Sequence, residues 1–133
     1  MSLSNEERST LVALELKKAH ETYDEIGILI DAKRLNGAAS RMYYAVFHAV
    51  CALLINDGHQ VNTHKGSHAL FNQQYIKTGA LPKEYGQLYN QLQTMREESD
   101  YNCAYDVGID ELQQRLEPAK RLIEDVEKLV NKQ

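Results

Sequence analysis

Two side chains able to handle a phosphate or a nucleobase lie in the middle of the chain. Arg41 and His48 are the only positive charge and the only histidine of a largely apolar run, residues 38–55. At about 100° per residue, the step from Arg41 to His48 is two helical turns less roughly 20°, so both side chains lie on one helix face. Tyr44 falls between them. If this face opens onto a cleft, the guanidinium and the imidazole can bind a phosphate or a base together.

A buried polar network is the other explanation for the same pair, and we favour it. A helix that is apolar on nearly every face is normally the central helix of its domain, and charges there occur mostly in pairs. Asp100 is a candidate partner for Arg41, because it lies near the end of a later predicted helix, where a carboxylate opposes the helix dipole. His48 would then bond to a tyrosine or to a backbone carbonyl.

The composition indicates a single helical domain. The chain of 133 residues is 43% hydrophobic and 26% charged, with only seven Gly and two Pro, which favours a globular protein rich in helix formers and excludes a disordered one. We therefore expect one domain over residues 1–133. The net charge of −4 argues against a surface that binds long DNA by counterion release, although a local anion site remains open.

The first residues and the cysteines favour a cytoplasmic protein. The chain starts with neither the basic segment nor the apolar core of a signal peptide, and no uncharged apolar stretch of about 18 residues is present, so no membrane span is expected. Cys51 lies in the apolar run and Cys103 in a polar segment. This placement suits two reduced thiols better than a disulfide.

The spacing of apolar residues predicts five helices and no strand. The predicted ranges are about 4–34, 37–56, 64–77, 82–100 and 110–131. Ser4 and Glu7 have the spacing of a capping box at the first start, and residues 36–37 should separate the first two helices. Pro118 should kink or break the last helix. The fold class is therefore all-α, an antiparallel up-and-down bundle of four main helices plus a shorter helix.

Histidines and tyrosines outside the apolar run carry weaker signals. His64 and His68 are four residues apart, but two histidines without a carboxylate are more often solvated or capping side chains than metal ligands. No Walker loop, dinucleotide fingerprint or paired cysteine ligands are present, so we predict no metal and no cofactor. Tyr44 and Tyr101 can stack on bases, although aromatic residues at helical spacing more often fill a core or an interface.

Four segments together carry a resemblance to a known family. They are NGAASRMYYAVFHA at residues 36–49, THKGSHALF at 63–71, KTGALPK at 77–83 and REESDY at 96–101. In this order they resemble the HEPN-domain family of small prokaryotic helical proteins. The resemblance implies an up-and-down bundle, often a homodimer, frequently encoded beside a minimal nucleotidyltransferase as a toxin–antitoxin pair. Several branches are metal-independent RNases, in which an Arg stabilises the phosphate and a His after four to six residues acts as general acid or base.

This sequence departs from the family's nuclease motif. The late-helix position has Arg96 but no histidine after it, since Asp100 and Tyr101 stand there. The Arg-to-His spacing occurs instead at Arg41 and His48, in the central helix. We therefore favour a member that kept the fold and binds a nucleotide, RNA or a nucleotidyltransferase partner within a toxin–antitoxin-type module.

Two further functional alternatives stay open. The first is an RNase toxin that uses Arg41 and His48, and the second is a helical scaffold without a ligand. In the favoured reading, the residues that form a binding or structural network are Tyr44, His64, Arg96, Asp100 and Tyr101.

Overall fold

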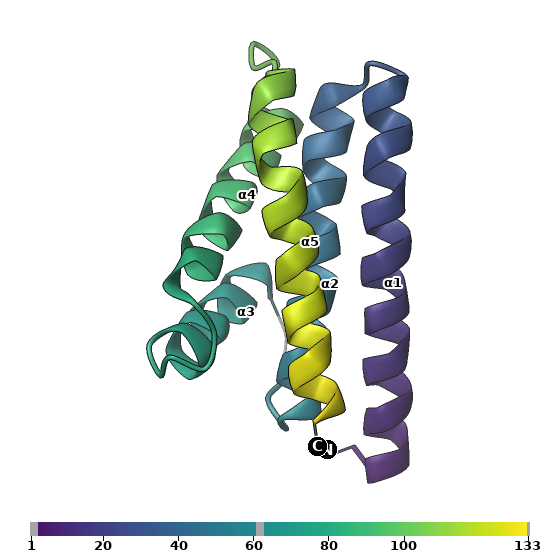
Figure 1. The fold of residues 1–133 in the computed structure, drawn as a ribbon, viewed down its shortest axis with the longest axis vertical. Coiled ribbons are helices and arrows are strands. Elements are labelled where there is room, and N and C mark those ends of the chain that lie inside the picture. The colour runs from purple at the N-terminus through teal and green to yellow at the C-terminus, as the bar shows by residue number, and fades with distance from the viewer. Residues whose placement is uncertain (1–2, 61–62, 133) are drawn as a thin grey trace.

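The computed structural model describes residues 3–60 and 63–132, and in these it contains α-helices, one π-helical segment and no strand. The elements are α1 (Asn5–Asp31), α2 (Leu35–Asn56), α3 (His64–Phe71), η1 (Asn72–Ile76), α4 (Lys83–Tyr101) and α5 (Ile109–Asn131). The long helices alternate in direction along the chain, and α4 is inclined to the other three (Figure 1). The predicted all-α bundle with four main helices and a shorter one is confirmed.

α2 is the central helix of the bundle and packs against α1, α3, α4 and α5. Its five alanines at positions 38, 39, 45, 49 and 52 are fully buried, which lets neighbouring backbones approach closely, while Met42 and Tyr43 fill volume between them. By length and composition α2 could also cross a membrane, with a mean hydropathy of 1.4. However, 67% of that apolar stretch is buried inside the bundle, and a central core helix meets the same criterion.

The predicted capping box begins α1. The Ser4 hydroxyl accepts from the Glu7 N–H at 3.1 Å, and the Glu7 carboxylate accepts from the Ser4 N–H at 2.9 Å. The apolar stripe then faces α2, with Val12, Leu16 and Ile26 buried. The turn after α1 differs from the prediction, because residues 36–37 lie inside the first turn of α2. The chain turns instead at Lys33, whose φ of 59° is in the left-handed region.

The predicted third helix is shorter than expected and changes its winding. α3 starts at the predicted Thr63 cap, whose hydroxyl accepts from the Gly66 N–H at 2.8 Å. It ends at Phe71, where η1 follows, and the Lys77 N–H donates to the carbonyl of Asn72, five residues earlier. Pro118 lies within α5, which continues unbroken to Asn131.

Candidate functional site

The structure places Arg41, Tyr44 and His48 on one face of α2, as their spacing predicts. The guanidinium carbon of Arg41 lies 5.6 Å from the Tyr44 ring centroid, and the rings of Tyr44 and His48 are 6.5 Å apart. α1 supplies a separate carboxylate to each charged group. Arg41 Nη1 lies 3.7 Å from Glu25 Oε1, and His48 Nδ1 lies 3.2 Å from Glu15 Oε2. Arg41 and His48 are therefore each engaged by α1.

The predicted pairing of Arg41 with Asp100 is wrong. Asp100 instead accepts from Arg96 Nη1 at 3.3 Å, one turn earlier on α4. Side chains four residues apart on a helix lie next to each other, so Asp100 pairs with Arg96 of its own helix. The predicted bond of His48 to a tyrosine or a carbonyl is likewise replaced by the one to Glu15.

Arg96 is the most buried cation of this region. Its residue is only 9% exposed, and its guanidinium carbon lies 5.0 Å from the ring centroid of Tyr43 and 5.9 Å from those of Tyr44 and Tyr101. Its Nε is buried and has no hydrogen-bond partner within residues 3–60 and 63–132. Burial alone would lower the pKa of Arg96, but Tyr101, the two other tyrosines and Asp100 outweigh it and raise the pKa.

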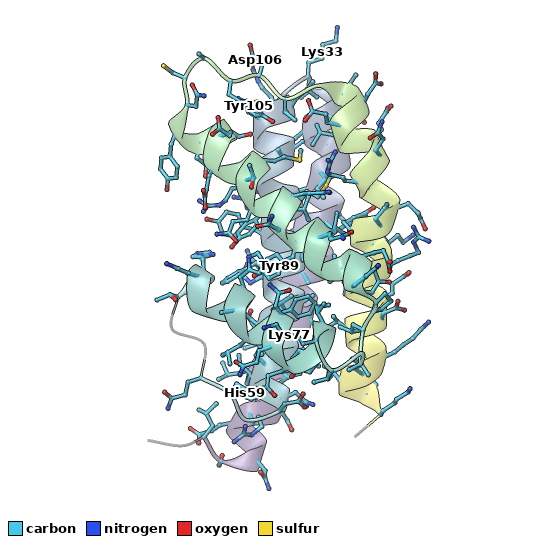
Figure 2. All side chains as sticks on the ribbon, turned by 90° about the vertical axis from the view of Figure 1, so that its left-hand side faces the viewer. Lys33, His59, Lys77, Tyr89, Tyr105 and Asp106 are labelled. Carbon is cyan, nitrogen blue, oxygen red and sulfur yellow. The ribbon has the colours of Figure 1, made fainter. Side chains whose placement is uncertain are left out.

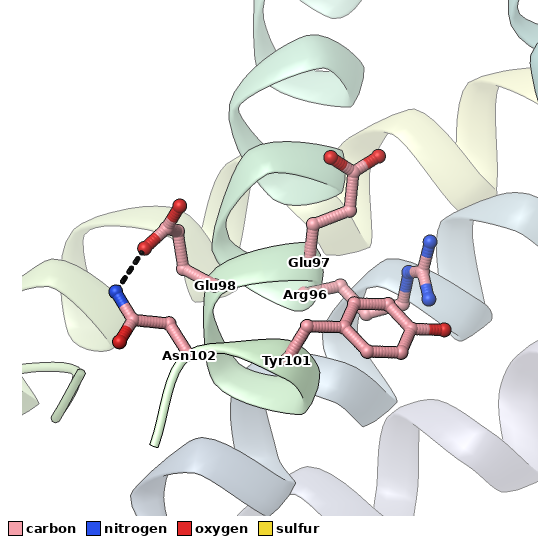
Figure 3. Close-up of a pocket in the computed structure, with 5 residues that line it drawn as sticks. All are labelled: Arg96, Glu97, Glu98, Tyr101 and Asn102. Atoms are coloured by element: carbon pink, nitrogen blue, oxygen red, sulfur yellow. Dashed lines mark hydrogen bonds between the residues drawn. The ribbon is translucent and has the colours of Figure 1, made fainter. Parts of the chain in front are cut away.

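A shallow depression at the end of α4 exposes one side of this arginine. Arg96, Tyr101, Glu97, Glu98 and Asn102 line it, and the Tyr101 ring stands beside the Arg96 side chain (Figure 3). Tyr101 is 78% exposed, so one face of its ring is available to a ligand. The Glu98 carboxylate accepts from the Asn102 amide at 2.9 Å, whereas Glu97 lies on the same side of α4 as Arg96 and Tyr101 (Figure 3). We refer to Arg96, Tyr101, Tyr43, Tyr44 and His64 as the Arg96 cluster.

His64 joins this cluster from the first turn of α3. Its ring stacks on Phe47 at 4.2 Å and lies within 6 Å of the centroids of Tyr43 and Tyr44, the rings that Arg96 also approaches. Loss of water contact lowers the pKa of His64, and the charges of Arg96 and His48 lower it further. The neutral form of the imidazole is therefore favoured at pH 7.

Hydrogen bonds beneath the cluster hold the His64 ring in place. Ser67 and Tyr89 hydroxyls lie 3.3 Å apart, and the Tyr43 hydroxyl lies 2.8 Å from His64 Nδ1. Burial raises the pKa of Tyr43 to about 12 despite a hydrogen bond from Tyr89. Tyr43 keeps its proton at pH 7, and where it donates this proton to Nδ1, the neutral imidazole carries its own proton on Nε2. Nε2 has no partner in the described part of the chain and can donate to an anion.

The structure brings the five predicted network residues together. The guanidinium of Arg96 lies beside the rings of Tyr44 and Tyr101, and His64 lies beside Tyr44. Asp100 bonds to Arg96 at the edge of this group. Sequence reasoning missed Phe47 as the surface under His64 and the Tyr89 hydroxyl beneath Tyr43. Phe47 could have been found from helical spacing, because it follows Tyr43 by four residues on the same face of α2.

The remaining candidates do not assemble into a metal site within the residues that the structure describes, where no group of at least three His, Cys, Asp or Glu lies close enough to share an ion. His68 Nδ1 donates to Gln93 Oε1 at 2.6 Å, away from His64. Both cysteines are free thiols. Burial raises the pKa of Cys51 to about 12, while Cys103 is exposed.

The chain is similar in sequence to one protein family and to several known proteins. The model of the HEPN domain family matches residues 12–132. A UPF0332 protein of Thermotoga maritima is 31% identical over 124 residues, covering 93% of this chain and 94% of that protein. The "Putative toxin MJ0142" of Methanocaldococcus jannaschii is 27% identical over 96 residues, covering 72% of this chain and 65% of its own length. The range matched by the family model includes α2 to α5, which carry the Arg96 cluster.

Proposed function

The chain belongs to the HEPN domain family and is related to two proteins that carry the name "Putative toxin". We propose that it binds single-stranded RNA as part of a toxin–antitoxin-type module. In this proposal Arg96 holds a phosphate and the exposed ring of Tyr101 stacks on a base. Guanidinium groups bind phosphate oxygens through parallel hydrogen bonds, and aromatic faces accept any base.

The observation that carries the proposal is the incomplete pairing of Arg96. A buried charge costs several kcal/mol unless partners replace its water, and a partly exposed i, i+4 pair such as Arg96–Asp100 contributes only about 0.3–0.5 kcal/mol. The three tyrosine rings add roughly 0.5–2 kcal/mol each, yet they leave the buried Nε without an acceptor. An oxyanion beside Tyr101 would accept from the part of the guanidinium that lines the depression, and the proton on His64 Nε2 would provide a second donor.

Carboxylates around the depression limit which nucleic acids fit. Glu97, Glu98 and Asp100 lie on α4 beside Arg96, and the whole chain has a net charge of −4. Such a surface repels a long duplex, whose affinity comes from many phosphate contacts. The same repulsion weakens the binding of a short single strand less. Such a strand needs only one phosphate contact, and stacking of its bases on aromatic rings adds to its affinity.

The test is the affinity of a short fluorescent single-stranded RNA, of about six nucleotides, measured by anisotropy at low salt. Arg96→Gln should weaken binding at least about tenfold, since a charged hydrogen bond contributes roughly 1.5–3 kcal/mol. The matched control is Arg121→Gln, which removes the same charge from α5. Equal affinities for the wild type and Arg96→Gln, or equal losses in the two variants, would contradict the proposal.

The nuclease alternative can be tested on the same samples, with the RNA incubated in EDTA. It requires Arg41 and His48 to act together, yet each has a carboxylate of α1 within 3.7 Å. We therefore expect equal, background-level cleavage from the wild type, Arg41→Ala and His48→Ala. Cleavage by the wild type that disappears in both variants would favour the RNase toxin instead.

The resemblance also leads us to propose a homodimer and a minimal nucleotidyltransferase as partner, in a cytoplasmic protein. Light scattering after size exclusion tests the first, because a mass of 15.2 kDa would mean a single chain. Co-purification with the product of a neighbouring nucleotidyltransferase gene tests the second. If neither RNA nor nucleotides raise the melting temperature, the scaffold without a ligand becomes the better explanation.

A further inference from the structure

A second depression lies between α3 and α4, next to the Arg96 cluster. Its polar lining includes Lys65, Asn72, Asn90, Gln93, Thr94 and Glu97, and its cavity volume is about 390 Å³, within the usual range of small-ligand sites. We call it the α3–α4 groove. Both helices face the viewer in Figure 2, where Tyr89 lies between them.

The groove adjoins the depression beside Arg96. Glu97 lines both, and Asn90, Gln93, Glu97 and Tyr101 follow one another at steps of three and four residues, so they form one stripe along α4. A strand bound at Arg96 and Tyr101 would therefore reach the groove by extending along this stripe.

Some of the polar groups in the groove are fixed by the protein itself. Gln93 accepts from His68 Nδ1 at 2.6 Å and donates to Glu97 Oε1 at 3.2 Å, so both ends of its amide are occupied. The Thr94 hydroxyl donates to the Asn90 carbonyl at 3.1 Å. The bond from Gln93 also keeps the Glu97 carboxylate on the groove side of α4.

Two carboxamides and one ammonium group remain unbonded in the described part of the chain. They belong to Asn72, Asn90 and Lys65. Gly86 lets Asn72 lie close to α4, since a Cβ at position 86 would be 2.8 Å from Asn72 Oδ1. Each carboxamide offers a donor and an acceptor side by side, the arrangement that pairs with the edge of a nucleobase. The groove therefore offers hydrogen bonds to a base rather than an apolar surface.

We propose that the α3–α4 groove binds the base of the nucleotide adjoining the phosphate at Arg96, and that Asn72 and Asn90 contact its edge. This inference rests on the proposed RNA binding and extends it, because it makes the site at least a dinucleotide site with hydrogen-bond readout. Single-stranded RNA is commonly read in this way, by hydrogen bonds to the edges of unstacked bases.

The experiment compares the dinucleotide ApA with two analogues that lack either the 5′ or the 3′ base, using calorimetry on the full chain. In the wild type, removal of the base that occupies the groove should weaken binding about tenfold, whereas removal of the other base should not show this preference. A tenfold change corresponds to the free energy of a bidentate contact between an amide and a base. In Asn72→Ala/Asn90→Ala this loss should shrink to less than about threefold. Asn90→Ala alone changes only an exposed helical side chain and should show part of the effect in a protein that melts like the wild type.

Two controls separate this inference from the function on which it rests. Gln87→Ala removes a matched amide from another depression along α4 and should leave the base preference unchanged. If Arg96→Gln weakens every probe while the double variant keeps the full base preference, the groove proposal is wrong and RNA binding stands. If the wild type binds none of the probes, both proposals fail. An equal loss of preference in Gln87→Ala would also overturn the groove assignment.

Discussion

Arg41 and Arg96 approach the ring of Tyr44 from two different helices, with guanidinium carbons 5.6 and 5.9 Å from its centroid. Their surroundings differ. The side chain of Arg41 is 39% exposed and faces the exposed carboxylate of Glu25, whereas that of Arg96 is 11% exposed and keeps an unpaired Nε. An exposed pair of this kind contributes little to stability. Arg96 is therefore the arginine that the fold itself fixes, against three aromatic rings and beside the depression that Tyr101 lines.

The two arginines show that the spacing of residues in the sequence and their surroundings in the fold are different kinds of evidence for a site. Arg41 attracts attention because a histidine follows at a nuclease-like distance, but its carboxylate partner comes from α1 and could not be found from local spacing. Arg96 has a carboxylate one turn away and looks like an ordinary surface residue of α4 in the sequence. Burial against three tyrosines, which only the fold creates, distinguishes it.

The largest contrast should appear in the stability of tyrosine variants beneath the two arginines. Tyr43 is fully buried and its hydroxyl bonds to His64, so Tyr43→Phe should lower the free energy of unfolding by about 1–2 kcal/mol. Tyr44 is half-buried, and its hydroxyl has no hydrogen bond in the described part of the chain, so Tyr44→Phe should change it by less than about 0.5 kcal/mol. Urea unfolding measures both. Similar losses for the two variants would mean that the buried hydroxyl is not part of a stabilising network.

A somewhat smaller contrast should appear in RNA affinity when each arginine loses its carboxylate. Asp100→Asn removes a negative charge about one hydrogen-bond length from Arg96 and should tighten RNA binding roughly fivefold at low salt, equivalent to about 1 kcal/mol. Glu25→Gln should leave the affinity within about 1.5-fold, because Arg41 does not hold the phosphate in our proposal. Anisotropy at two salt concentrations measures both variants. Weaker binding by Asp100→Asn would show that Asp100 orients Arg96 for the ligand and does not compete with it.

Much of the fold could be predicted from the sequence, because apolar periodicity decides which faces are buried. The predicted end of α2 at Asn56 and start of α3 at His64 agree with the structure, and Leu88, Leu92 and Met95 of α4 are buried as expected. The turn at Lys33 was missed, since a non-glycine residue at positive φ leaves no signature in composition. The π-helical segment η1 was missed for a similar reason, because helix propensity does not distinguish the two windings.

The candidate site was harder to predict than the fold. Single-face geometry placed Arg41, Tyr44 and His48 correctly, since helical spacing is enough for residues on one helix. The Arg96 cluster combines three helices, and contacts between helices depend on their crossing and rotation. The segments that resemble the family include His64, Arg96 and Tyr101. They did not show that His64 and Arg96 both contact the rings of Tyr43 and Tyr44.

The acid sensitivity of stability should sharpen the role of His64. Its pKa is lowered in the folded state, so the unfolded chain binds more protons once the pH falls below about 6.5, the ordinary histidine value. The stabilising contribution is therefore complete above that pH and is lost on acidification. His64→Gln should lose less unfolding free energy than the wild type between pH 7.5 and 5.5, in urea unfolding at each pH. Parallel pH dependences would show that His64 does not contribute, and the partial exposure of the ring keeps the expected difference small.

The smallest effect should come from the ion pair that holds Arg41. Arg41 Nη1 and Glu25 Oε1 are 3.7 Å apart and both side chains are well exposed, so water screens their attraction. A double-mutant cycle of Arg41→Ala and Glu25→Ala should give a coupling energy of at most about 0.5 kcal/mol, decreasing further at 0.5 M salt. A coupling of about 2 kcal/mol that persists in salt would mean that Arg41 is held as firmly as a buried charge, and the distinction between the two arginines would fail.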